Sequence, residues 1–142
     1  MTAEILSGAW AAAWRDALNA SEAYRAAAAS WEGTVVAVVR ADPGRGIESR
    51  AVFLDLWHGS CRDARLASDR DIEAARYVLT ASPSAWAELL GGTLDPIAAV
   101  MSGRLELTKG SVMALLPHVA AARELLVTAW ALGAPPPEWS AR

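Results

Sequence analysis

The sequence predicts an α+β fold with two layers, in which helices pack on one face of a five-stranded, mainly antiparallel sheet. Three observations lead to this prediction. The N-terminal stretch, residues 3–29, has apolar side chains at helical spacing. Five later segments are short and either β-branched or alternating in polarity, as strands are. Ser82-Pro83 and Asp95-Pro96 are typical helix starts, because the polar residue caps the helix and proline fits its first turn.

Length, charge and cysteine content limit the class of protein. A chain of 142 residues suits one domain, which we place at residues 1–133, followed by a proline-rich C-terminal tail at residues 134–142. The formal net charge is −3 and no basic block is present, so nucleic-acid binding is not expected. A single cysteine and an N-terminus without a basic stretch predict a cytoplasmic protein. The lack of a long unbroken apolar run predicts that it has no transmembrane segment.

Residues 3–29 are expected to form one long helix. Its apolar stripe recurs every seven residues, at Trp10, Ala17, Tyr24 and Trp31. Such a stripe most simply packs on a sheet. The alternative is that Trp10 and Trp14 stay exposed and bind a partner protein or a second copy of the chain, since aromatic anchors dominate interfaces.

The remaining elements follow from turn signals and periodicity. Strands are expected at residues 34–40, 50–58, 61–67, 77–81 and 104–108, with a tight hairpin at Gly59-Ser60. The charged residues 68–76 are expected to be a loop or a short turn. Helices should begin at Pro83 and Pro96, and Ser111 can cap a last helix. Pro117 should kink that last helix or divide it in two.

Three motifs in this order of elements resemble a known family. They are the strand Val52-Phe53-Leu54-Asp55-Leu56 with Gly59 after it, Trp86 followed by Leu89-Leu90-Gly91-Gly92, and Leu94-Asp95-Pro96 continuing to Lys109-Gly110. From Trp31 to about Trp130 the chain resembles the sterol carrier protein type-2 family, also called non-specific lipid-transfer protein. The long tryptophan-bearing N-terminal helix is similar to that of the small bacterial members.

This resemblance implies a lipid-carrier domain with a hydrophobic tunnel between sheet and helices. It implies a ligand such as a fatty acid, an acyl-thioester, a phospholipid or a quinone-like lipid, bound without chemistry and without a cofactor. On the second strand one face is wholly apolar, and that face should look toward the helices. We therefore expect the ligand to contact Val52, Leu54, Leu56, Trp86, Leu90, Met101, Leu105, Met113 and Leu116. The same residues would also suit a filled core, which is the arrangement an interaction module would have.

Residues His58, Ser60 and Cys61 could be taken for a catalytic group. A nucleophile needs a base within hydrogen-bond reach and a third group to orient that base. Neighbours in a hairpin turn usually point to different sides, so the sequence does not predict an enzyme. Two histidines and one cysteine also do not make a zinc site.

Overall fold

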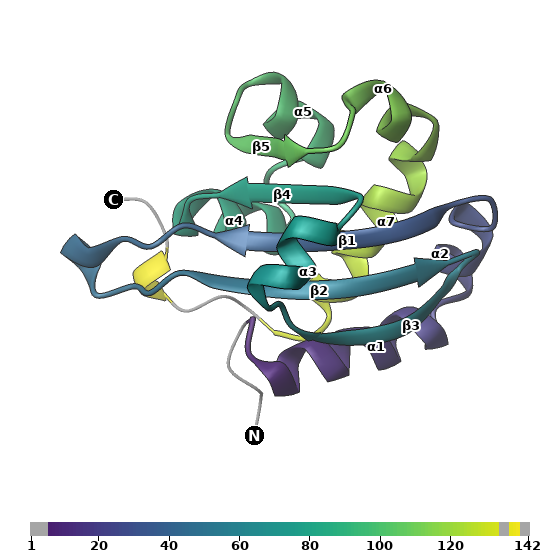
Figure 1. Ribbon diagram of the computed structural model, residues 1–142, viewed down its shortest axis with the longest axis horizontal. Coiled ribbons are helices and arrows are strands. Elements are labelled where there is room, and N and C mark those ends of the chain that lie inside the picture. The colour runs from purple at the N-terminus through teal and green to yellow at the C-terminus, as the bar shows by residue number, and fades with distance from the viewer. Residues whose placement is uncertain (1–5, 134–136, 140–142) are drawn as a thin grey trace.

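A computed structural model describes residues 6–133 and 137–139 and has a mixed sheet of five strands in the order β3-β2-β1-β4-β5 (Figure 1). Strands β1 and β4 pair in parallel, and every other neighbouring pair is antiparallel. The α+β class and all five predicted strands are confirmed, with boundaries shifted by at most two residues. The strands are β1 Glu32–Val39, β2 Arg50–Trp57, β3 Ser60–Leu66, β4 Tyr77–Ala81 and β5 Leu105–Lys109.

Seven α-helices and three short 3-10 turns complete the described part of the chain. The helices are α1 Gly8–Ala20, α2 Glu22–Ala27, α3 Asp69–Ala74, α4 Pro83–Leu90, α5 Pro96–Met101, α6 Val112–Leu115 and α7 Val119–Trp130. The 3-10 turns are η1 Pro43–Arg45, η2 Leu116–His118 and η3 Pro137–Trp139. Helices α4 and α5 begin at the two predicted prolines, each with its capping side chain bonded to the first turn.

The predicted long N-terminal helix is in fact two helices, with the break at Ser21. The backbone of Ser21 is extended, and its hydroxyl accepts a hydrogen bond from the backbone N–H of Tyr24 at 3.0 Å. A serine that caps a new helix competes with continuation of the old one, which is why the apolar periodicity runs through the break without showing it. Residues 3–5 of the predicted helix lie outside the described residues.

Helix α1 buries its tryptophans in the core. Trp10 and Trp14 are 3% and 2% exposed, and their rings lie 4.9 Å apart between centroids. The Trp14 indole N–H donates to the carbonyl of Leu125 and to the Thr128 hydroxyl, both at 3.1 Å, which ties α1 to α7. The alternative in which these two tryptophans form an exposed partner surface is therefore wrong.

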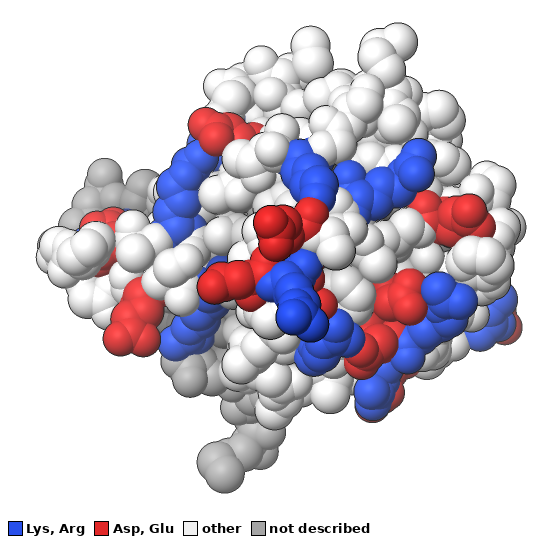
Figure 2. Space-filling model, viewed as in Figure 1, with Lys and Arg blue, Asp and Glu red and all other residues white. Residues whose placement is uncertain are grey.

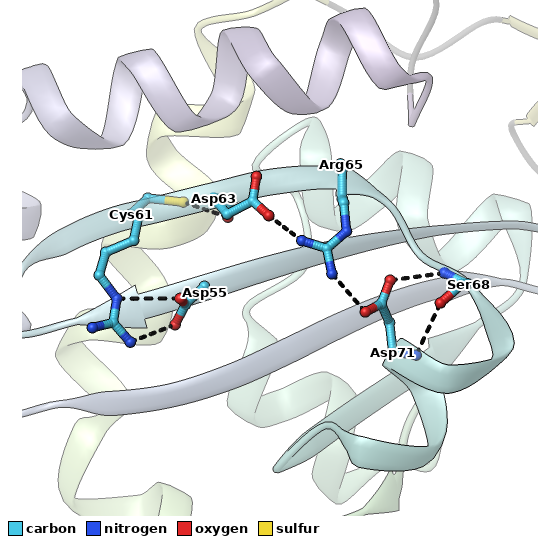
Figure 3. A network of polar contacts seen from close by, with 7 residues as sticks. Asp55, Cys61, Asp63, Arg65, Ser68 and Asp71 are labelled. Carbon is cyan, nitrogen blue, oxygen red and sulfur yellow. Dashed lines mark hydrogen bonds and ion pairs between the residues drawn. The ribbon is translucent and has the colours of Figure 1, made fainter.

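Residues 68–76, predicted as a loop or a short turn, contain the short helix α3, which lies on the sheet face opposite the other helices (Figure 1). Ser68 and Asp71 cap one another's backbone N–H groups, and this capping box is the local signal for α3. Arg65 on β3 forms ion pairs with both Asp63 and Asp71 and so joins α3 to the sheet edge (Figure 3). Ile72 adds an apolar contact to the small cluster on this face.

The β2–β3 hairpin turns at His58-Gly59, one residue earlier than predicted. Both residues have positive φ, 47° and 87°, as a two-residue turn of this kind requires. A Cβ atom on Gly59 would lie 2.8 Å from the backbone oxygen of Arg25, so glycine also allows the hairpin to approach α2 closely. Ser60 is already part of β3, paired with Trp57.

Pro117 divides the last helical stretch, as predicted, into α6, the turn η2 and α7. Ser111 occupies the capping position before α6, as predicted, but its side chain makes no bond to the first turn. By length and composition Val112–Trp130 is apolar enough to cross a membrane, although Arg123 and Glu124 interrupt its apolar run. In the structure this stretch is broken at Pro117, and Leu125, Leu126 and Ala129 pack into the core.

The expected tail is not wholly exposed. Trp139 in η3 is only 3% exposed and belongs to the main core cluster. The rest of the proline-rich segment, residues 134–136 and 140–142, lies outside the described residues.

Candidate functional site

An apolar cavity of about 50 Å³ lies between the sheet and the C-terminal helices. Its wall presents only carbon atoms of apolar groups, so nothing on it could bind an ion or perform acid–base chemistry. The residues that line it are Trp14, Trp31, Val35, Ala37, Tyr77, Leu79, Trp86, Pro96, Leu105, Leu115, Ala122, Leu125 and Leu126.

The floor of the cavity comes from the two strands that pair in parallel. Val35 and Ala37 on β1 stand beside Tyr77 and Leu79 on β4 in the observed register. Side chains two residues apart share one face of a strand, so all four point toward the helices. Leu105 continues this floor onto β5.

The other side of the cavity is formed by five helices, α1, α4, α5, α6 and α7. The polar edges of two of the tryptophans in this wall are satisfied within the protein. The Trp86 indole N–H donates to the carbonyl of Val38 at 2.8 Å, and that of Trp14 bonds to α7. Trp31 stacks on His118, with 5.8 Å between ring centroids, and its buried indole N–H has no hydrogen-bond partner.

Only two of the nine predicted ligand contacts line this cavity, namely Trp86 and Leu105. Val52, Leu54 and Leu56 do face the helices and are at most 1% exposed, as the strand alternation predicted. However, α1 packs over β2 and β3, and its Trp10 and Leu18 fill that part of the helical layer. Leu90 is buried in the core as well, away from the cavity wall.

Met101, Met113 and Leu116 lie on the outside of the protein, contrary to the expected place in the wall. Their exposed fractions are 78%, 74% and 45%. The reason is helical phase, because residues two apart in a helix project about 200° apart. Helix α6 turns Leu115 inward, which leaves Met113 facing outward, and α5 does the same with Ala99 and Met101.

Sequence reasoning missed most of the cavity floor because it did not find which strands are neighbours. The parallel pairing of β1 with β4 makes the centre of the sheet from segments far apart along the chain, since Val35 pairs with Tyr77 and Val39 with Ala81. The sequence does contain one signal for the central position of the fourth strand, which begins with the consecutive apolar residues Tyr77, Val78 and Leu79. A central strand that is buried on both faces has such a run.

The residues considered for catalysis are held in structural contacts. The two ring nitrogens of His58 lie 2.8 Å from the carbonyl of Ala29 and 2.9 Å from the carboxylate of Glu32. The Cys61 thiol donates to the carbonyl of Asp63, and burial raises its pKa to about 12, so it stays protonated and weakly nucleophilic. Within residues 6–133 and 137–139, no three acidic, histidine or cysteine side chains gather as metal ligands would.

One charged pair stands at the rim of the site. Asp95 caps α5 and also accepts a bond from Arg123 on α7 at 2.7 Å. The Arg123 contact, aided by the backbone N–H groups of Ala98 and Ile97, holds the pKa of Asp95 below its ordinary value of 3.8. This pair fixes the start of α5 to α7 beside the cavity.

Comparison with known proteins identifies the family. The family model described as "SCP-2 sterol transfer family" matches residues 15–118, which is more than half of the chain. The chain belongs to the SCP-2 sterol transfer family. The comparison with curated protein sequences gave no match.

Solved structures that are similar to this chain have the same fold. A crystal structure of sterol carrier protein 2 is 44% identical, with a TM-score of 0.81, over 89% of this chain and 98% of that one. A conserved hypothetical protein from Thermus thermophilus is 43% identical, with a TM-score of 0.81, over 94% of this chain and 92% of that one. The apo form of sterol carrier protein 2 from Yarrowia lipolytica, 22% identical with a TM-score of 0.58 over 84% of this chain and 88% of that one, shares the fold.

Proposed function

We propose that this protein binds and carries a hydrophobic ligand, such as a fatty acid or another lipid with an acyl chain, in an enlarged form of the cavity. The observation that supports this best is the wholly apolar wall of the cavity, in a member of the SCP-2 sterol transfer family. On this proposal the protein is a carrier and not an enzyme. The buried Cys61 and the hydrogen-bonded His58 fit a carrier without catalytic residues. We also propose that the protein is cytoplasmic.

The cavity must widen when the ligand enters. An apolar cavity of about 150 Å³ can hold benzene. This cavity has only about 50 Å³, which is far less than a fatty acid fills. The segments best able to move outward are α5 and α6, because both helices are short and bury few residues. Helix α5 buries only Pro96 and Ala99, and α6 buries only Leu115.

The driving force is the removal of hydrocarbon from water. Each buried methylene contributes roughly 0.8 kcal/mol, so ten of them contribute on the order of 8 kcal/mol before the costs of ordering the chain and moving the wall. A wall without polar atoms selects for length and bulk and does not distinguish one functional group from another. We therefore expect binding of several lipid classes with similar strength.

The proposed ligand contacts differ in how directly they would touch the ligand. Trp86, Leu105 and Leu115 would touch the ligand first, because they already line the cavity. A longer chain would push toward the neighbouring core of Leu90, Val52, Leu54 and Leu56. The exposed residues Met101, Met113 and Leu116 would reach the ligand only while it passes through the wall.

A cavity-filling substitution tests this proposal. Ala122 on α7 lines the cavity, and Ala120 lies exposed on the same helix, so Ala122→Phe and Ala120→Phe form a matched pair. A fluorescent fatty acid titrated into the wild type and A120F should bind with similar affinity. Binding by A122F should be weaker by about tenfold or more, because the ring occupies space that the chain needs. Equal binding by A122F, or none by the wild type, would contradict the proposal.

A further inference from the structure

Among the residues that line the cavity, Trp31 alone has a buried polar side-chain group without a partner in the described part of the chain. Its side chain is 3% exposed, and its indole N–H has no acceptor there. The indoles of Trp14 and Trp86 both donate to backbone carbonyls. The Tyr77 hydroxyl accepts from the Arg76 guanidinium at 3.3 Å. Buried donors are nearly always hydrogen-bonded in native proteins, so the Trp31 N–H needs an explanation.

The fold holds the Trp31 indole in place. The backbone N–H of Trp31 donates to the carbonyl of Ala28 at 2.9 Å, and its own carbonyl accepts from the N–H of His58 at 2.8 Å. The indole ring contacts the rings of Tyr77 and His118, with 6.4 Å and 5.8 Å between centroids. A side chain packed in this way cannot turn to find an acceptor elsewhere in the protein. The acceptor must therefore come to Trp31.

The register of the sheet places Trp31 at one end of the cavity. Trp31 directly precedes β1 and Tyr77 begins β4, so both lie at the same end of this parallel pair. Leu105 lies at the other end, where it pairs with Ala81, the last residue of β4. Trp86 also lies toward that end, because its indole bonds to the second-last residue of β1. A linear ligand with its polar group at Trp31 would therefore extend its chain toward Trp86 and Leu105.

The charged side chains of β2 and β3 lie on the other face of the sheet. Figure 2 shows that face, where acidic and basic groups lie side by side over β2, β3 and α3. Arg62 pairs there with Asp55, and Arg65 pairs with Asp63 and Asp71. The sheet separates these ion pairs from the cavity, so they cannot bind a polar group inside it. A ligand oxygen within the cavity depends on the free indole N–H.

An indole N–H can only donate, so its partner must be an acceptor. A buried water fits poorly, because it needs about two to four polar partners and the cavity wall exposes none. We propose that the Trp31 indole N–H donates to the carbonyl or carboxylate oxygen of an acyl lipid, which reaches it as the cavity widens. This inference rests on the proposed carrier function. Fatty acids, esters and thioesters all offer that oxygen, whereas a hydrocarbon does not.

One pair of variants tests the Trp31 contact. Trp31→Phe removes the free N–H, whereas Trp86→Phe removes an N–H that is bonded to Val38, and both replace a cavity-lining indole by a smaller ring. Calorimetric titration with dodecanoate measures the affinity of each protein. The affinity of W31F should fall about tenfold, and that of W86F less than about threefold. Affinity of W31F at the wild-type level, or an equal fall in W86F, would overturn the contact.

The indole N–H signals in the nitrogen–proton NMR spectrum of the wild type give a second readout, which a purely structural role of the ring would not change. On addition of dodecanoate the Trp31 signal should move downfield, and the already bonded Trp14 and Trp86 should move less. The signals are assigned in the wild type, so this test stands even if W31F does not fold. A Trp31 signal that stays in place while dodecanoate binds would overturn the contact and leave the carrier function standing. A wild type that binds no dodecanoate would overturn the carrier function, and the contact with it.

Discussion

The two ends of the helical layer are built differently. At the N-terminal end, the single helix α1 buries Trp10, Ala11, Trp14 and Leu18 against the sheet and bonds to α7 through an indole N–H. At the other end, α5 and α6 together bury only three side chains and leave Met101 and Met113 mostly exposed. The cavity lies where these two kinds of packing meet.

This difference indicates a division of roles. The α1 end holds the sheet in shape, because its side chains are buried against β2 and β3 and bonded to α7. The α5 and α6 end suits the proposed ligand binding, because displacing these two helices exposes little apolar surface. The following predictions compare the two ends, from the largest expected effect to the smallest.

Truncating one buried leucine at each end should give unequal losses of stability. Leu18→Ala in α1 should lower the free energy of unfolding by about 3 kcal/mol, since Leu18 is fully buried and its loss leaves a new cavity. Leu115→Ala in α6 should cost about half as much, because Leu115 already borders a cavity and is 8% exposed. Urea unfolding of both variants measures the difference, and equal losses would mean that the two ends are packed alike.

Replacement by phenylalanine should change the free energy of unfolding differently for Trp14 and Trp31, which both line the cavity. Trp14→Phe removes an indole N–H that bonds to Leu125 and Thr128, whereas Trp31→Phe removes one that has no partner. Loss of a buried hydrogen bond costs about 1 kcal/mol, so W14F should be less stable than W31F by about that amount. The same urea unfolding experiment decides it, and W31F as the less stable variant would contradict this account of the α1 end.

Acid should loosen the cavity end slightly through Asp95. The pKa of this carboxyl is lowered in the folded protein, chiefly by Arg123, so its contribution to stability is present above pH 3.8 and is lost as the pH falls through the folded value. Asp95→Asn keeps a helix cap but removes the ion pair. The wild type should therefore exceed D95N in stability at about pH 7, and the gap should shrink near about pH 3. A gap that widens in acid would reverse the sign of this prediction.

Local signals in the sequence were enough for most elements. Alternation identified the inward face of β2, and the capping residues Ser82 and Asp95 with their prolines placed the starts of α4 and α5. Local signals were insufficient where two of them compete. At Ser21 the apolar stripe continues along the sequence, but the serine caps a new helix and so ends the first one. The capping box of Ser68 and Asp71 shows that α3 was predictable, although its charged residues suggested a loop.

The candidate site was harder to predict than the fold because it depends on long-range neighbours. Met101 and Met113 have apolar, flexible side chains that would suit a cavity wall, but the phase of their short helices turns them outward. That phase is set by Ala99 and Leu115, whose burial is decided by tertiary packing. Tyr77 and Val35 could be paired only by knowing that β1 and β4 are adjacent.

The most direct test of the central claim is a structure of the protein with a long-chain fatty acid added. We expect the acyl chain to lie between β1–β4 and helices α5–α7, in contact with Trp86, Leu105 and Leu115. Helices α5 and α6 should move outward while α1 keeps its place on β2 and β3. A chain bound elsewhere, such as in the surface groove beside Trp130, or a cavity that stays empty at saturating fatty acid, would contradict the account.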